Sequence, residues 1–165
     1  MSTQKIYALP VETTGWKFDG ATEISFNWEY DDGSADLLNL YEKGKQQQWD
    51  ASTRLDWSLE LNPDNPMELK DEAISIWGTD YWNKMTDKER AWLRLHLQAN
   101  SISQFLHGEQ GALSLSASLC HILLDPGAQE YAANQAREEA RHVAGFTRYI
   151  AKRWGDPLPV GPTIA

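Results

Sequence analysis

The sequence has one cysteine, few basic residues and no long apolar run, and each shortage excludes a class of protein. The single cysteine, Cys120, excludes an internal disulfide. No stretch approaches the roughly 20 apolar residues of a membrane-spanning helix, and the N-terminus lacks the apolar core of a signal peptide, so we expect a cytoplasmic protein. A formal net charge of -9, with no cluster of Lys and Arg, argues against nucleic-acid and anionic-membrane partners.

Proline is also scarce where the longest helices are expected. Thr86 and Glu89 form a capping-box pattern, and no proline follows until Pro126, so one helix could reach about 38 residues. Asp125 then fits an N-cap before Pro126, and a second helix is predicted over about 127–154 with Gly155 as its stop. Because the connection is short, residues 86–155 should form an antiparallel helix pair.

The remaining segments are predicted to be shorter and less regular. Residues 1–33 show no helical period and are expected to form an extended arm. Residues 34–85 should hold short helices, at about 35–49 and 69–77, separated by a loop that ends in two Asn-Pro pairs. The proline-rich residues 156–165 form a tail. A chain of 165 residues, 41% hydrophobic and 24% charged, is expected to be a single all-α domain, 1–165.

Two carboxylates and one imidazole stand in the apolar stripes of the long helices. Glu139 and His142 are one helical turn apart on the same face, and Glu109 occupies the matching stripe of the first helix. Glu109 precedes the Asp125 turn by about as many residues as Glu139 follows it, so the two acids should come level. A carboxylate buried without a partner is costly, which favours metal ligation by Glu109, Glu139 and His142.

The fragments FLHGEQGA and EEARH resemble the first half of ferritin-like di-iron carboxylate proteins, in particular bacterial multicomponent monooxygenase hydroxylases and the ribonucleotide reductase small subunit. The resemblance implies a ferritin-like helical bundle that holds iron, or manganese, on Glu109, Glu139 and His142. It implies that Glu138 and Arg141 orient these ligands through hydrogen bonds. The residues expected to line a substrate pocket are Leu106, Gly108, Ala112 and Phe146.

One feature separates the chain from ribonucleotide reductases. Phe146 stands one turn after His142, where those enzymes commonly carry a radical tyrosine, which argues against that activity. The resemblance instead favours a monooxygenase-like enzyme, with O2, a small apolar or aromatic substrate and a reductase or other electron donor as partners.

The chain offers only half of the family's ligand set. Sites of this class use four carboxylates and two histidines, whereas no Glu or His follows His142 and no other Glu-x-x-His occurs. Two explanations stand: the missing half of the bundle belongs to a longer protein, or a homodimer pairs two copies about a two-fold axis. The first explanation fits an oxygenase, and the second fits a ferritin-like iron-binding or ferroxidase protein with its di-iron site at the homodimer interface. A non-enzymatic helical fragment is the remaining alternative.

Overall fold

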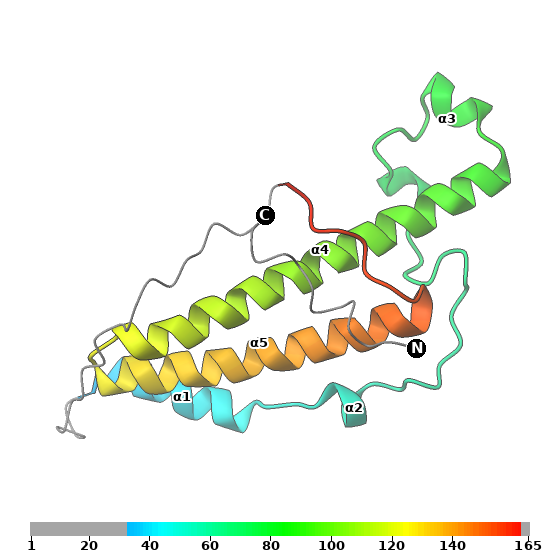
Figure 1. The fold of residues 1–165 in the computed structure, drawn as a ribbon. Coiled ribbons are helices and arrows are strands. Elements are labelled where there is room, and N and C mark those ends of the chain that lie inside the picture. Colours follow the sequence, from blue (N-terminus) through cyan, green and yellow to red (C-terminus); the bar gives the residue numbers. More distant parts are fainter. Residues whose placement is uncertain (1–32, 163–165) are drawn as a thin grey trace.

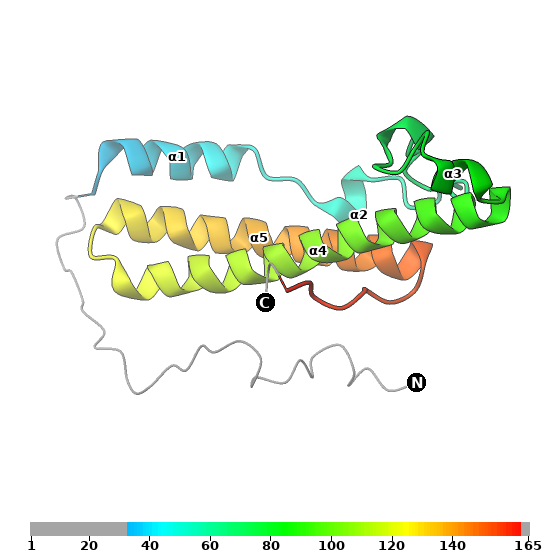
Figure 2. The same cartoon turned by 90° about the horizontal axis from the view of Figure 1, so that it is seen from above.

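The computed structural model describes residues 33–162, and in this part of the chain the secondary structure is helical, without strands. Three helices lie side by side, with α5 (Pro126–Arg153) between α4 (Asp87–Ile122) and α1 (Ala35–Gln46) (Figures 1 and 2). The prediction of an all-α half-bundle built on a long helix pair is confirmed. No helix in the described residues is long and apolar enough to cross a membrane.

Helix α4 begins where the capping-box pattern predicts. The Thr86 hydroxyl accepts a hydrogen bond from the Glu89 backbone N–H, and the Glu89 carboxylate accepts one from the Thr86 N–H at 2.7 Å. Both ends of this exchange satisfy backbone donors that a helix N-terminus otherwise leaves unpaired. From that cap the helix continues for 36 residues, close to the predicted length.

The turn between the two long helices is also built as expected. The Asp125 side chain accepts the Ala128 N–H at 2.7 Å and caps α5, and Pro126 occupies the first helical position. The other carboxylate oxygen of Asp125 accepts the Ser34 N–H at 3.0 Å, and this bond fixes the start of α1 to the same turn. At the C-terminal end of α5, Gly155 has the left-handed backbone conformation (φ 94°). Glycine adopts this conformation more easily than other residues, and it commonly ends a helix.

The core between α4 and α5 is small. Its residues lie farther from the turn at Asp125 than the candidate ligands do. It consists of buried Ile102 and Leu106 from α4 with Ile150 from α5. Partly buried residues of the second half of α5 and its end pack around them: Val143, Phe146, Tyr149 and Trp154.

The prediction of one helix over 35–49 was wrong at its end. Helix α1 stops at Gln46, and a second short helix, α2 (Ala51–Arg54), lies in the segment predicted to be loop. The Asp50 side chain accepts the Ser52 N–H and caps α2, which requires the extended backbone that breaks the longer helix.

A helix over 69–77 was also wrongly predicted. This segment contains only a 3-10 turn, η3 (Asp71–Ala73), and helix α3 (Asp80–Lys84) follows. The preceding loop is held to α4 by long-range bonds, because the buried Gln98 side chain accepts the Met67 N–H at 2.7 Å and donates to Asn65 at 2.8 Å. Within the segment itself, Arg94 of α4 donates to Asp71 at 2.5 Å, so contacts with α4 hold the 3-10 turn in place. The predicted extended arm lies outside the described residues.

Candidate metal centre

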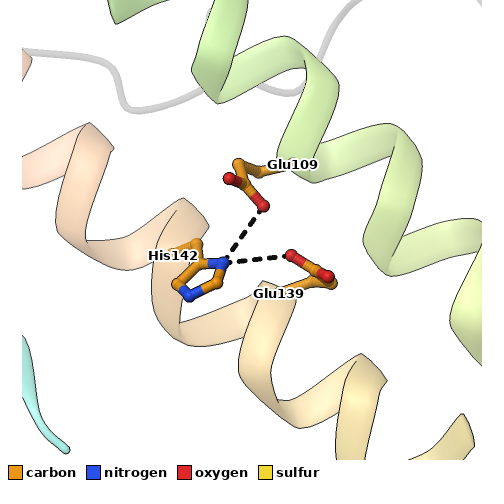
Figure 3. A group of neighbouring side chains, drawn as sticks. All are labelled: Glu109, Glu139 and His142. Carbon is orange, nitrogen blue, oxygen red and sulfur yellow. Dashed lines mark hydrogen bonds and ion pairs between the residues drawn. The ribbon is translucent and has the colours of Figure 1, made fainter.

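Glu109 of α4 and two residues of α5, Glu139 and His142, converge on one point between the helices (Figure 3). The His142 Nδ1 lies 3.1 Å from a carboxylate oxygen of Glu109 and 3.1 Å from one of Glu139. One ligand atom from each residue falls within 4.8 Å of the other two. One side chain of α4 and two of α5 thus present three donor atoms to a common position.

The local sequence explains this convergence. Glu139 and His142 are one turn apart, so both point from α5 towards α4. The Asp125 turn reverses the chain about midway between Glu109 and Glu139, and a rise of about 1.5 Å per residue brings the two acids level. The Glu139 side chain is only 9% exposed, whereas those of Glu109 and His142 are 25% and 30% exposed.

The two carboxyl groups interact closely enough to shift each other's pKa. The hydrogen bond shared with Glu139 raises the pKa of Glu109, and burial acts in the same direction. That same bond, together with a hydrogen bond from the Gln135 amide, lowers the pKa of Glu139. The two carboxyl groups therefore differ in pKa, with that of Glu109 raised and that of Glu139 lowered.

This donor set fits a first-row transition metal. Carboxylate and imidazole are ligands that iron and manganese accept, and to coordinate them the carboxyl group must be ionised and the imidazole must be neutral. In residues 33–162 the ion-pair partner of both carboxylates is His142, with no Lys or Arg bridge to either. A divalent ion at this position would compensate the negative charge of the two carboxylates, of which that of Glu139 is buried.

Glu138 and Arg141 face away from this point, towards the end of α1. The Glu138 carboxylate accepts the Gln48 amide at 2.9 Å, and Arg141 donates to the Gln48 side chain at 2.9 Å and to the Trp49 carbonyl at 3.2 Å. The Arg141 guanidinium also stacks 4.6 Å from the Trp49 ring. Glu138 also accepts the Asn134 amide at 3.2 Å, and orientation of the ligands by Glu138 and Arg141 stays a prediction.

Two neighbours of the ligands were not identified from the sequence. Gln135 donates to Glu139 from one turn earlier on α5, and its i,i+4 spacing could have identified it. Trp49 places its ring centroid 6.3 Å from that of His142. No local pattern points to Trp49, because its place depends on how the segment between α1 and α2 crosses α5.

A shallow hollow adjoins Glu109 on α4. Gly108 and Ala112, both expected at a pocket, line it together with Phe105 and Gln104. Asn100 and Ser101 form its far end. Two other expected pocket residues lie elsewhere: Leu106 is in the core, and Phe146 lies behind Phe105, with ring centroids 6.2 Å apart.

Comparison with known proteins identifies the helix pair. The family model of the p-aminobenzoate N-oxygenase AurF matches residues 31–163, which include both ligand-bearing helices and α1. The chain belongs to this family. AurF proteins are ferritin-like di-iron oxygenases, so the resemblance to the ferritin-like di-iron superfamily is confirmed. No curated protein and no solved structure gave a significant match.

Membership in the AurF family gives the three converging side chains a chemical context. The matched residues contain Glu109, Glu139 and His142, and a group of two carboxylates and an imidazole could hold a metal ion. The chain is therefore a member of a di-iron oxygenase family. Its described residues present one group of side chains that could hold a metal ion.

Proposed function

We propose that this chain supplies half of the di-iron centre of an oxygenase that transfers one oxygen atom of O2 to the nitrogen of an aromatic amine. The observation that carries the proposal is the convergence of Glu109, Glu139 and His142 in a helix pair that the family match covers. Membership in the family of the p-aminobenzoate N-oxygenase AurF supports this reaction.

The three side chains would hold iron, and manganese is the alternative that the same donors accept. A di-iron centre supplies the capacity to activate dioxygen. Transfer of one oxygen atom to nitrogen, with release of the other as water, consumes two electrons and two protons. A reductase or another electron donor is therefore part of the proposal.

The hollow beside Glu109 supports a substrate site at this end of α4. Gly108 and Ala112 leave room next to the carboxylate, and Phe105 offers an aromatic face. A mainly apolar concave surface with a few polar groups is the usual setting for a small organic ligand. A flat aromatic ring fits such a surface better than hydrated iron does, which favours an oxygenase over an iron store.

The other half of the site would come from a second helix pair packed on α4. Two series on α4 repeat every seven residues, the spacing of a helix-packing seam, and three of their large members are exposed: Phe105 (60%), Leu115 (56%) and Ile122 (60%). The members of the seam are Phe105, Gly108, Ala112, Leu115, Leu119 and Ile122. A second copy of the chain, or further helices of a larger assembly, would complete the ligand set.

A ferritin-type ferroxidase is the second candidate. The observation that favours it is the single Glu-x-x-His per chain, because two copies related by a two-fold axis would give a symmetric site with four carboxylates and two imidazoles. Such a protein would oxidise iron and accumulate a mineral in a closed oligomer.

Anaerobic loading of the full chain with Fe(II), followed by iron analysis and solution mass, tests the proposal. We expect two irons per dimer, loss of iron in Glu139→Gln, and retention of iron in the matched control Glu130→Gln, an exposed glutamate of the same helix. Addition of O2, an electron donor and p-aminobenzoate should then give an O2-dependent N-oxygenated product.

Other outcomes separate the alternatives. Equal iron content in the two variants would contradict the assignment of the ligands. Accumulating ferric mineral without product would favour the ferroxidase, and an iron-free monomer would rule out self-pairing.

A further inference from the structure

Residues 156–161, called here the C-terminal strap, fold back along α4 after the turn at Gly155 (Figure 1). The Leu158 N–H donates to the Ser103 hydroxyl at 2.9 Å, and the Leu158 carbonyl oxygen lies 2.8 Å from the His107 Nε2. Ser103 is completely buried and also donates to the Ala99 carbonyl at 2.6 Å. The strap therefore satisfies a buried hydroxyl and is fixed to α4 rather than free.

The Gln104 side-chain amide makes two hydrogen bonds with the same strap, one through its oxygen and one through its nitrogen. Its oxygen accepts the Gly161 N–H at 2.6 Å, and its nitrogen donates to the Pro159 carbonyl at 2.9 Å. A Cβ at residue 161 would stand 3.1 Å from the Gln104 amide oxygen, so a side chain there would push the amide aside by a few tenths of an ångström. These contacts hold the orientation of the amide and leave one lone pair on its oxygen for another partner.

Gln104 also lines the hollow beside Glu109. The two residues are five positions apart on α4, about 7.5 Å along the helix axis, which is comparable with the span of a para-substituted benzene ring. Asn100 and Ser101 lie at the Gln104 end, and none of the residues that line the hollow in the described structure is basic. A substituent at this end meets hydrogen-bonding groups of α4, and the described residues that line the hollow offer it no cationic side chain.

We propose that Gln104, held in place by the C-terminal strap, recognises the substituent opposite the reacting nitrogen and selects aromatic amines whose para substituent is neutral and hydrogen-bonding. The inference rests on the proposed function, because it takes Glu109 as the end of the hollow where the nitrogen reacts. Gln104 is the specificity-determining residue, and the strap is a positioning element that acts through it.

Dissociation constants of three ligands for the iron-loaded full chain test this inference. Aniline has the ring and the amine alone, p-aminobenzamide adds a neutral polar group, and p-aminobenzoate adds an anionic one. We expect p-aminobenzamide to bind most tightly. In Gln104→Ala its advantage over aniline should fall about fivefold, the usual value of one hydrogen bond. The matched control is Gln110→Ala, an exposed glutamine of the same helix.

Gly161→Ala tests the strap separately, because the contacts that a Cβ would make there are with the Gln104 side chain. The selectivity should fall in the same direction as in Gln104→Ala but less, with unchanged thermal unfolding and unchanged iron content. A structural role alone would lower stability and affect aniline and p-aminobenzamide equally.

Three results would overturn the inference. One is unchanged selectivity in Gln104→Ala, another is tighter binding of p-aminobenzoate than of p-aminobenzamide, and the third is no binding of any of the three amines. In each case iron bound by the wild type would leave the metal assignment of the proposed function standing. A wild type that takes up no iron would overturn both.

Discussion

At the residue scale, the segment Glu138-Glu139-Ala140-Arg141-His142 serves two faces of α5. Glu139 and His142 point to Glu109, whereas Glu138 and Arg141 hold Gln48 and Trp49 at the end of α1. A helix turns about 100° per residue, so residues three apart share a face and adjacent residues do not. One short motif thereby joins the candidate metal centre to the docking of the N-terminal helices.

Gln135 is expected to strengthen metal binding through Glu139. Its amide donates to the carboxylate oxygen that does not face His142, so Gln135→Ala should leave that oxygen free to turn away. Outer-sphere partners of this kind typically contribute about 10–100-fold in metal affinity. Titration of the metal-free protein with Fe(II) or Mn(II) measures the change, with Gln110→Ala as control. An unchanged affinity would show that Gln135 does not orient the ligand.

Arg141 is expected to contribute more to stability than to metal affinity. Arg141→Lys removes the planar group that stacks on Trp49 and bonds to Gln48, and we expect a loss of about 1–2 kcal/mol in the free energy of unfolding. Urea unfolding of the metal-free protein measures it. If Arg141 instead acts mainly on the ligands, Arg141→Lys would lower metal affinity more than Gln135→Ala does.

At the element scale, α4 and α5 are defined by local signals and the shorter elements are not. The capping box at Thr86 and the Asp125-Pro126 start are complete within four residues, and the structure contains both. By contrast, η3 and α2 are three and four residues long, too short for helical periodicity to specify them. Their conformation depends on contacts with distant segments.

The capping box should make the stability of α4 depend on pH. Hydrogen bonds from the Thr86 N–H and hydroxyl lower the pKa of Glu89. A lowered folded-state pKa gives stability that is present above the ordinary glutamate pKa and is lost as the pH falls through the folded value. Thr86→Ala should cost about 1 kcal/mol at pH 7 and less at pH 3.

Urea unfolding at the two pH values checks this expectation, and Thr86→Ser is the matched control because it keeps the hydroxyl. A cost of Thr86→Ala that is the same at both pH values would show that the hydrogen bond from the Thr86 hydroxyl to the Glu89 carboxylate does not contribute to stability.

At the scale of the whole molecule, the described residues leave one side of the α4–α5 pair without a partner. Helix α1 packs on α5 (Figure 2), while Phe105, Leu115 and Ile122 of the heptad-spaced seam of α4 are exposed. The described residues thus place three candidate ligands beside an exposed apolar face, and the proposed second helix pair would account for both.

Disruption of this seam should separate association from folding. Leu115→Glu places a charge on an exposed side chain, so the free energy of unfolding of the monomer should change by no more than about 0.5 kcal/mol. Iron-dependent dimer formation should be lost, because a charge buried in an apolar contact is costly. Sedimentation with and without Fe(II) measures it, with Leu59→Glu, an exposed leucine outside the seam, as control. A dimer that survives in Leu115→Glu would place the interface elsewhere.

The sequence by itself determined the long helix pair and the meeting of Glu109, Glu139 and His142. These features depend on caps, on the absence of proline from Thr86 to Asp125 and on regular spacing along helices, all of which act over one or two turns. Counting residues from a single turn was enough to bring the acids level.

Only the tertiary structure decided where Trp49, Leu106 and the C-terminal strap lie. Trp49 reaches His142 because the chain crosses α5 after α1, and the strap is held by side chains more than 50 residues earlier. Such contacts join segments that carry no matching local signal, so their energy appears only when the elements pack. That is why the candidate ligands could be predicted and the surroundings that position them could not.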